Sequence, residues 1–284
     1  MSKQKRKHIP RQSEAKSKSS AGVVTGPEYP TEEIKWWREA IEGLLVAIVL
    51  ALLIRGFEAE AFVIPTGSMA PTLRGRHKDV LCEQCGHDYA VGASLDHENQ
   101  QGLVVMTTCP MCAYNQAIEY SKSRDASVAG DRILVNKFSY DPMGQPERFD
   151  VIVFKNPNDA KQNYIKRLCG VPGDVLSIEE PHLYNHGKIT HEPVIERVAR
   201  AEDGYSGYQL AGSNYPTARL RKPTDQLRLR ADGDPAMREY AALGDNTGNS
   251  LDSRYWGQVR GFNTVGPALF ALWPFTSGHW GFID

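Results

Sequence analysis

Four cysteines have the spacing of a metal site. Two residues separate Cys82 from Cys85 and Cys109 from Cys112, and 23 residues lie between the two pairs. Each pair stands next to a glycine or contains a proline, which permits the tight turn that a C-x2-C ligand pair needs. Two such turns can direct four thiolates at one tetrahedral ion, and zinc is its usual occupant. Four sulfur ligands leave no position for water, so this zinc would be structural and not catalytic.

Two disulfides are the main alternative for these cysteines, because this part of the chain is expected outside the cytoplasm, where thiols are readily oxidised. Redox or iron–sulfur chemistry is a third, less favoured interpretation. The fifth cysteine, Cys169, has no second cysteine nearby in the sequence. We expect Cys169 to be a small buried apolar residue.

An uncharged apolar run, Gly43–Ile54 (GLLVAIVLALLI), indicates a membrane segment. The run is shorter than the roughly 20 helical residues that cross a bilayer core, so a span has to include the flanks and would cover residues 36–57. Trp36 and Trp37 suit the membrane–water interface. We therefore expect one N-terminal transmembrane helix that anchors the chain in the cytoplasmic (inner) membrane.

The N-terminal region is basic and polar, with nine Lys/Arg against four Glu in residues 1–38. Residues 1–30 have too few apolar side chains to form a core, so we expect a disordered cytoplasmic tail. A solvated tail that binds no partner is favoured over a tail that contacts anionic lipid or nucleic acid. Because positive charge precedes the apolar run, the N-terminus is expected in the cytoplasm and residues 58–284 outside it.

The sequence Ala59-Glu60-Ala61 looks like an A-x-A cleavage site, so the apolar run could instead be a cleaved signal peptide or a buried soluble helix. Cleavage after Ala61 would leave Ser68 only seven residues from the new terminus. The polar region before the run is also unusually long for a signal peptide. An uncleaved anchor is favoured, and self-cleavage at this site stays open.

The elements that would carry the chemistry are short strands. Runs rich in Val, Ile, Tyr and Phe lie between Gly, Pro and Asn turns at residues 131–135, 150–154, 164–169 and 175–178. This stretch shows no long helical period, so a mainly antiparallel β-sheet domain is predicted. Two regions interrupt it: residues 74–129, a zinc-ribbon-like insert with the four cysteines, and residues 180–240, a β-ribbon or loop.

Common catalytic patterns are not found around these strands: G-x-S-x-G, H-E-x-x-H and the P-loop do not occur, and the eight histidines are scattered. Instead, four ordered segments resemble the boxes of bacterial type I signal peptidases, the S26-type serine/lysine proteases. They are IPTGSMAPTL (64–73), GDRILVNKF (130–138), YIKRLCGVPGD (164–174) and GDNTGNSLDSRYWG (244–257). The resemblance covers roughly residues 36–73, 130–178 and 243–273.

This resemblance implies that Ser68 attacks the peptide bond and that Lys166 is its general base. A free lysine has a pKa of about 10.4 and is protonated at neutral pH, so Lys166 must be desolvated to act. Tyr164, Ile165 and Leu168 supply apolar surroundings, and burial lowers the pKa of an amine. No cofactor is expected for catalysis.

Further roles follow from the resemblance alone. Thr66 and the backbone N–H of Ser68 would form the oxyanion hole, and Ser250 would orient the amine of Lys166. The expected structural ion pairs involve Arg167, Asp245, Asp252 and Arg254. Shallow pockets for small residues one and three before the cut would be lined by Phe62, Ile64, Met69, Val153, Tyr164 and Ile165, although for each of them taken singly a place in the core is favoured over the pocket.

Together these features predict a membrane-bound endopeptidase that removes signal peptides from exported preproteins after Ala-x-Ala-like sites. Expected partners are the preproteins, membrane lipid and the protein translocation machinery, with no nucleic acid. One departure weakens the match: Thr247-Gly248 stands where the family has Arg-Asp, so a rearranged loop is expected. The alternative is a membrane-tethered zinc-ribbon binding module on a weakened or inactive peptidase scaffold.

Overall fold

A computed structural model describes residues 31–53, 59–94, 104–118, 127–140, 144–200, 204–273 and 280–283. The predicted tail, residues 1–30, and the end of the predicted membrane segment, residues 54–57, lie outside the described residues. The chain divides into two units, Met1–Leu50 and Ala51–Asp284, which are described separately.

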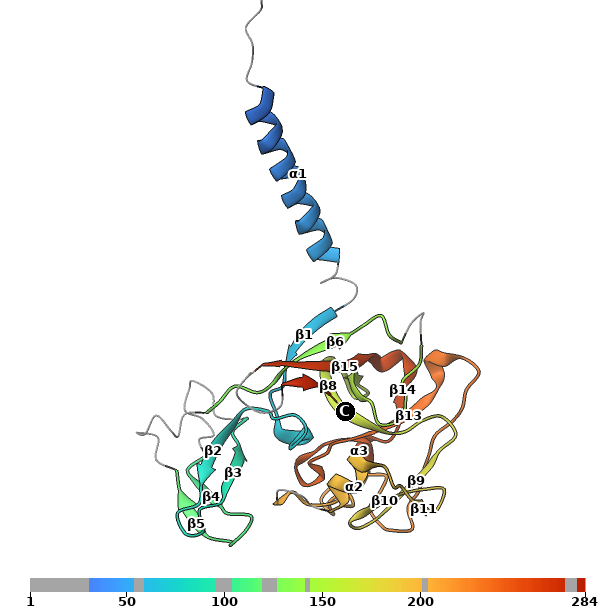
Figure 1. Ribbon diagram of the computed structural model, residues 1–284. Coiled ribbons are helices and arrows are strands. Elements are labelled where there is room, and N and C mark those ends of the chain that lie inside the picture. Colours follow the sequence, from blue (N-terminus) through green and yellow to red (C-terminus); the bar gives the residue numbers. More distant parts are fainter. Residues whose placement is uncertain are drawn as a thin grey trace, which may run out of the picture. The chain divides into compact units, whose positions relative to one another are not determined.

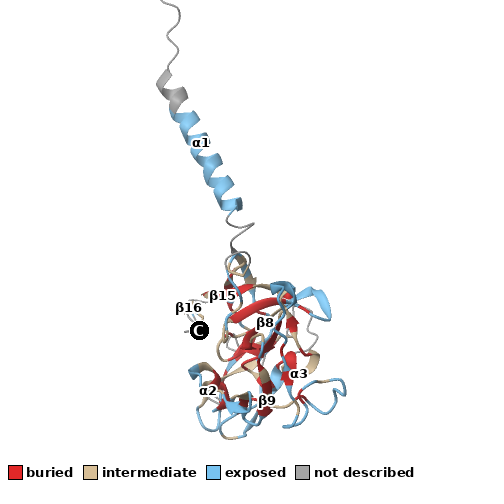
Figure 2. Cartoon of the chain, turned by 90° about the vertical axis from the view of Figure 1, so that its right-hand side faces the viewer, coloured by how far each residue is buried: buried red, intermediate tan, exposed pale blue. Residues whose placement is uncertain are grey.

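Helix α1 spans Thr31–Leu53 and is built mainly from Ala, Leu, Ile, Val and Glu (Figure 1). Its described side chains, from Trp36 to Leu53, are all exposed (Figure 2). Within the described part of the chain, no helix combines the length and the hydropathy that a membrane span requires.

The second unit consists mainly of strands. Their bounds are β1 Ala59–Val63, β2 His77–Leu81, β3 Asp88–Gly92, β4 Met106–Thr108, β5 Asn115–Ala117, β6 Arg132–Asn136, β7 Val151–Asn156, β8 Asp159–Gly170, β9 Val175–Glu179, β10 His182–Asn185, β11 Lys188–Ile189, β12 Leu227–Arg228, β13 Glu239–Leu243, β14 Val259–Arg260, β15 Thr264–Trp273 and β16 Gly281–Phe282. The helices are α2 Pro193–Ala199 and α3 Ser253–Trp256, with 3-10 turns η2 Gly67–Met69, η5 Pro235–Met237, η6 Thr247–Asn249 and η7 Gly261–Asn263.

The main sheet has the strand order β1-β6-β15-β7-β8-β13-β14, with β16 paired to β15. Every strand pairing among the described residues is antiparallel. The four predicted strands lie in β6, β7, β8 and β9. The prediction of a mainly antiparallel β domain is therefore confirmed.

The four-cysteine lobe, residues 77–92 and 106–117, consists of the hairpins β2–β3 and β4–β5 (Figure 1). The four cysteines lie at the turns of these hairpins, because each C-x2-C pair separates two short strands. Residues 180–240 contain β10, β11, α2, β12 and η5.

Residues 180–240 share their core with the main sheet. Ile195 of α2, Leu183 of β10 and Leu227 of β12 are buried in one cluster with Leu243 of β13 and Cys169 of β8. Cys169 is buried as expected. This region and the main sheet therefore share one apolar cluster, and that cluster includes a residue of β8, the strand that carries Lys166.

Candidate active site

Ser68 and Lys166 lie in contact although they are 98 positions apart in the chain. The Nζ atom of Lys166 is 2.6 Å from the Oγ atom of Ser68, and it donates a second hydrogen bond to the carbonyl oxygen of Ile165 at 2.7 Å. Both side chains are almost inaccessible to water, with exposures of 4% for Ser68 and 2% for Lys166. A nucleophile and an amine base within hydrogen-bond reach form a unit suited to proton transfer.

Burial lowers the pKa of Lys166 to about 8, and the negative charges of Asp252 and Asp245 oppose this shift. Strand pairing sets Lys166 opposite Ile152 of β7, and the amine lies 5.5 Å from the ring centroid of Tyr164. Of the three apolar neighbours predicted from the sequence, Tyr164 therefore lies near the amine. An amine with this pKa is about one-tenth neutral at pH 7, a far larger neutral fraction than that of an ordinary lysine.

The backbone around Ser68 is held by Asn246, a residue for which the sequence predicted no role. The backbone N–H of Asn246 donates to the carbonyl oxygen of Ser68 at 3.0 Å, and its side-chain Nδ2 donates to the carbonyl oxygen of Gly67 at 3.0 Å. Ser68 lies in the short 3-10 turn η2, whose first N–H groups have no acceptor within the turn. Asn246 thus fixes the peptide unit that carries the N–H of Ser68.

Thr66 precedes this turn in an extended conformation. Its side chain is exposed and makes no capping hydrogen bond to η2. The Thr66 hydroxyl is therefore exposed and not engaged in capping this turn.

Arg167 and Asp245 form a buried ion pair behind Lys166. The guanidinium contacts both carboxylate oxygens, with Nε to Oδ1 at 2.9 Å and Nη2 to Oδ2 at 2.8 Å. Thr72 donates its hydroxyl to Asp245 and accepts hydrogen bonds from Arg167 and Arg197. The sequence assigned no role to Thr72, although the residue stands inside the first motif.

Asp252 and Arg254, both in the last motif, form a second buried ion pair. Arg254 contacts both carboxylate oxygens, at 2.8 and 2.9 Å. Its Nη2 also donates to the carbonyl oxygens of Thr247 and Ser250, at 2.7 and 2.9 Å. One guanidinium thereby holds both ends of the loop that contains Ser250.

Ser250 is buried, and its hydroxyl oxygen has no hydrogen-bond partner among the described residues. A side chain added at Gly244 would lie 2.3 Å from this oxygen and 2.5 Å from the carbonyl oxygen of Ser68. Gly244 therefore lies between the Ser250 hydroxyl and the Ser68 backbone, and only glycine fits there because both groups are so close.

The Thr247-Gly248 departure has a structural explanation. Thr247 is buried and donates its hydroxyl to the carbonyl oxygen of Gly207. A Cβ atom at Gly248 would lie 2.8 Å from Oγ of Ser206 and 3.4 Å from Oε1 of Gln209. The side chains of Ser206 and Gln209 occupy the space beside this loop, so a larger residue at position 248 would require at least the Ser206 side chain to move.

The predicted pocket residues fall into two clusters. Five of them pack in the core beneath η2: Phe62, Ile64, Met69, Val153 and Ile165. Tyr164 instead packs with Phe154 and Trp256 in a different cluster. Phe62 and Ile165 are partly exposed, whereas Ile64, Met69 and Val153 are buried. The structure therefore separates Tyr164 from the other five residues.

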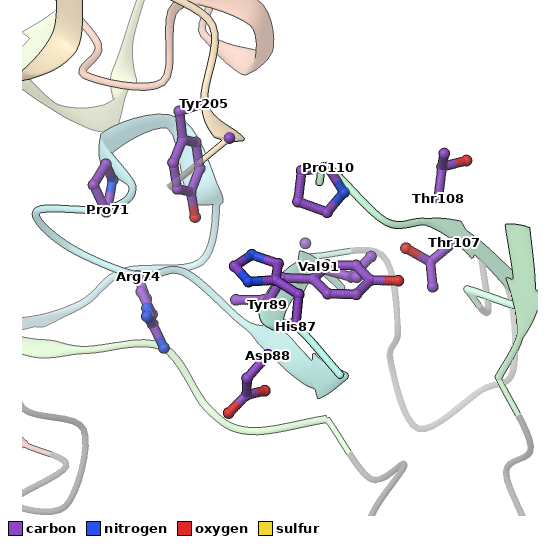
Figure 3. Close-up of a pocket in the computed structure, with 13 residues that line it drawn as sticks. Pro71, Arg74, His87, Asp88, Tyr89, Val91, Thr107, Thr108, Pro110 and Tyr205 are labelled. Carbon is purple, nitrogen blue, oxygen red and sulfur yellow. The ribbon is translucent and has the colours of Figure 1, made fainter. Parts of the chain in front are cut away.

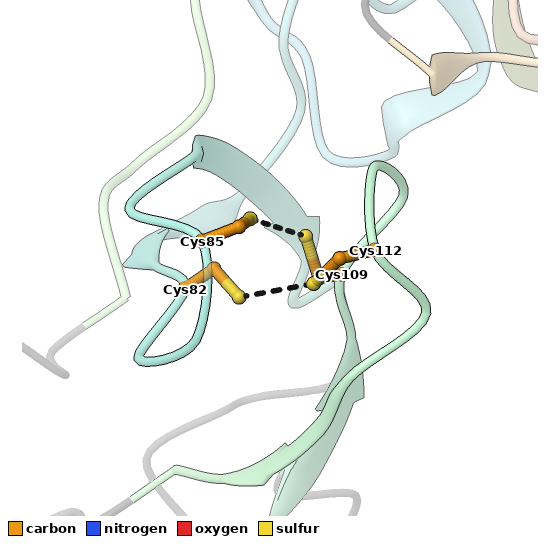
Figure 4. A group of neighbouring side chains, drawn as sticks. All are labelled: Cys82, Cys85, Cys109 and Cys112. Carbon is orange, nitrogen blue, oxygen red and sulfur yellow. Dashed lines mark hydrogen bonds between the residues drawn. The ribbon is translucent and has the colours of Figure 1, made fainter.

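The four cysteine sulfurs converge on one point (Figure 4). All lie within 4.8 Å of one another, with Cys82 to Cys112 at 3.5 Å and Cys85 to Cys109 at 3.7 Å. A tetrahedral zinc with bonds of about 2.3 Å to sulfur has sulfur–sulfur edges of about 3.8 Å. None of the four sulfurs takes part in a disulfide. The sulfur geometry therefore fits a metal ion.

Known proteins provide independent comparisons. A family profile described as "Signal peptidase, peptidase S26" matches residues 100–273. Signal peptidase I of Pseudomonas aeruginosa is 29% identical over 253 residues, which cover 80% of this chain and 68% of that protein. Probable signal peptidase I-2 of Synechocystis is 27% identical over 244 residues, covering 84% of this chain and 74% of that protein.

Signal peptidase I of Bacillus caldolyticus is 33% identical over 174 residues, which cover 61% of this chain and 87% of that protein. A solved signal peptidase I from Enterococcus faecalis V583 is 27% identical and matches 43% of this chain and 95% of that chain with a TM-score of 0.32. With a family profile that extends over more than half of its length, the chain belongs to the signal peptidase family, peptidase S26.

Proposed function

We propose that this chain is a membrane-bound serine endopeptidase that removes signal peptides from exported preproteins after small-x-small sites. The observation that carries the proposal is the 2.6 Å contact between a buried lysine amine and the hydroxyl of Ser68. The chain is a protease by its family. Its relatives are signal peptidases, and the substrates of such an enzyme are preproteins.

In the first step the neutral amine of Lys166 accepts the hydroxyl proton of Ser68 while Oγ attacks the scissile carbonyl carbon. The carbonyl oxygen becomes an oxyanion. It would accept hydrogen bonds from the N–H of Ser68, which Asn246 holds in place, and from the hydroxyl of Thr66. Arg167 and Asp245 take no part in this proton transfer. Their ion pair holds Arg167, the residue of β8 that directly follows Lys166, in place.

In the second step the lysine ammonium gives its proton to the leaving amine, which departs as the new N-terminus of the mature protein. Lys166, neutral again, then takes a proton from the water that attacks the acyl ester, and it passes this proton to Oγ of Ser68 as the ester bond breaks, which releases the acid and restores Ser68. We assign the orientation of the amine during the reaction to Ser250, whose buried hydroxyl makes no hydrogen bond to Lys166 here but lies beside the Ser68 backbone. The small-residue pocket is assigned to Phe62, Ile64, Met69, Val153 and Ile165, and also to Tyr164, although Tyr164 packs in a separate cluster.

We propose a single membrane anchor over residues 36–57, with residues 1–30 as a cytoplasmic tail and residues 58–284 outside the cytoplasm. Exposed apolar side chains on α1 support it, since Leu44, Val46 and Leu52 have more than half of their surface accessible. A helix that is apolar around its circumference needs a non-aqueous environment or a partner. Membrane lipid and the translocation machinery are the corresponding partners.

We also propose that the four-cysteine site holds zinc as a structural ion. Residues 74–129, which contain the four cysteines, would be one insert in the peptidase domain, and residues 180–240 would be a second insert. The proposal rests on the sulfur geometry and on the C-x2-C spacing. Bound there, zinc would hold the two hairpin turns together. All four protein ligands are sulfurs, so the ion would not activate water.

The purified enzyme should cleave a precursor with an Ala-x-Ala site, and its kcat/KM should increase with pH up to about 8 and then level off. Only the neutral amine of Lys166 can accept a proton, and with a pKa of about 8 it is mostly protonated below that pH. The measurement is cleavage between about pH 6 and 10, with product termini identified by mass spectrometry. A Lys161→Ala control, altered at an exposed lysine of the same strand, should give the same profile. A rate that is constant or decreases across this range would exclude Lys166 as the base.

Elemental analysis should find about one zinc per chain in the purified protein. The Cys82→Ser/Cys109→Ser variant should lose the metal and melt at a lower temperature, because the two hairpins would no longer be cross-linked. Cys169→Ala is the matched control, since this buried cysteine lies outside the cluster, and it should keep the metal. Protein without metal and without titratable thiols at the four positions would instead indicate two disulfides.

A further inference from the structure

Two adjoining cavities lie next to the Ser68 turn. The larger, of about 370 Å³, lies between β3, the residues Thr107, Thr108 and Pro110 of the four-cysteine lobe, and Tyr205 (Figure 3). The smaller, of about 50 Å³, reaches Gly67, Asn246 and Asn249. The two share the lining residues Arg74, Ala90, Gly92 and Tyr205. They therefore form one groove, which runs from the four-cysteine lobe to the residue before Ser68.

The groove follows the edge of β3. All residues from His87 to Gly92 line the larger cavity. Successive side chains of a strand point to opposite faces, so a cavity that touches every one of them has to run along the edge. Among the described strands, β3 pairs only with β2. An extended polypeptide could therefore add to β3 through main-chain hydrogen bonds, a mode that accepts varied sequences.

The other wall of the groove is formed by segments that are distant in sequence. Pro71 follows the Ser68 turn, Pro110 lies within the second C-x2-C pair, and Tyr205 belongs to residues 180–240 (Figure 3). Gly204 has a φ of +78°, and a Cβ atom there would lie 2.5 Å from Pro110. Glycine at this position lets the Tyr205 segment approach the cysteine turn closely. Rings of Tyr and Pro give contacts that do not depend on one particular substrate side chain.

The groove lies apart from the proposed small-residue pocket. None of the six residues assigned to that pocket lines either cavity. If that pocket takes the residues before the cut, a chain continuing past Ser68 meets Gly67 and Asn246 and then β3. The five residues of β3 span about 17 Å, which suits about five residues of an extended substrate.

We propose that this groove binds the first residues of the mature protein, those that follow the cut, as an extended strand along β3. The four-cysteine lobe thereby acts as part of the substrate-binding surface. This inference deepens the proposed function and rests on it. Binding energy from residues remote from the scissile bond can raise kcat/KM by positioning that bond.

The first test compares two peptides with the same Ala-x-Ala site, one ending about two residues and the other about ten residues after the cut. The wild-type enzyme should cleave the longer peptide with roughly tenfold higher kcat/KM. In Gly92→Trp this ratio should fall toward one, because a side chain at Gly92 enters open space within the groove. The matched control is Gly233→Trp, which also has open space but lies outside the groove, and its ratio should equal that of the wild type. An equal kcat/KM for both peptides in the wild type would overturn the inference and leave the proposed function standing.

The second test does not depend on cleavage or on the folding of Gly92→Trp. The Ser68→Ala protein is irradiated with the longer peptide carrying a benzophenone on the third residue after the cut. Adducts are expected within residues 87–92 or at Tyr205. Adducts at Phe62 or Ile64 would overturn the inference, as would an unreacted protein when the same group placed before the cut does react. Failure of the wild type to cleave either peptide would instead count against the proposed function, and the cross-link would still report on the groove.

Discussion

Replacing Ser68 with alanine or Lys166 with methionine is expected to lower precursor cleavage by roughly 10⁴–10⁶-fold, because the nucleophile and its base act as a unit. Their 2.6 Å contact means that removing either group leaves the other without its partner in proton transfer. Methionine retains much of the length of the lysine side chain but has no amine. The measurement is single-turnover cleavage of an Ala-x-Ala precursor, followed by gel and mass spectrometry.

Lys161→Ala and Ser213→Ala serve as matched controls, since both residues are exposed and lie outside the site. Both should cleave at the wild-type rate. Circular dichroism and the melting temperature will show whether the Ser68 and Lys166 variants are folded. A folded Lys166→Met protein that retains the wild-type rate would exclude the proposed base, and such a Ser68→Ala protein would exclude the nucleophile.

Replacing Asp245 with alanine is expected to lower the free energy of unfolding by about 3–5 kcal/mol, because the charge of Arg167 would remain buried without its carboxylate. The two side chains are 0% and 1% exposed. Water therefore cannot replace the lost partner without opening the core. Urea denaturation measures the effect, and cleavage should be lost as well, because Asn246 follows directly and holds the Ser68 turn.

The double variant Arg167→Met/Asp245→Leu removes both charges and should recover much of the lost stability. Glu192→Ala, at an exposed carboxylate without a capping hydrogen bond, should have almost no effect. If Asp245→Ala alone is as stable as the wild type, the ion pair does not hold the site together.

The sequence by itself determined the features that depend on local order. Short runs rich in Val, Ile, Tyr and Phe between turns predicted β6 to β9, because strand patterning and turn chemistry are local properties. The spacing of Cys82, Cys85, Cys109 and Cys112 predicted a convergent cluster, since a C-x2-C turn brings its own two sulfurs together. The four motifs and their order indicated the family, although only resemblance linked Ser68 to Lys166.

The tertiary structure decided what depends on contacts between distant segments. The sequence offered no reason for Asn246 to hold the Gly67–Ser68 backbone or for Thr72 to join Asp245 with two arginines, because these partners lie far apart in the chain. It also gave no reason why position 248 is glycine, since Ser206 and Gln209 become its neighbours only after folding. The groove along β3 is of the same kind: packing brings β3 and three other segments that are distant in sequence together, and no local pattern encodes the space between them.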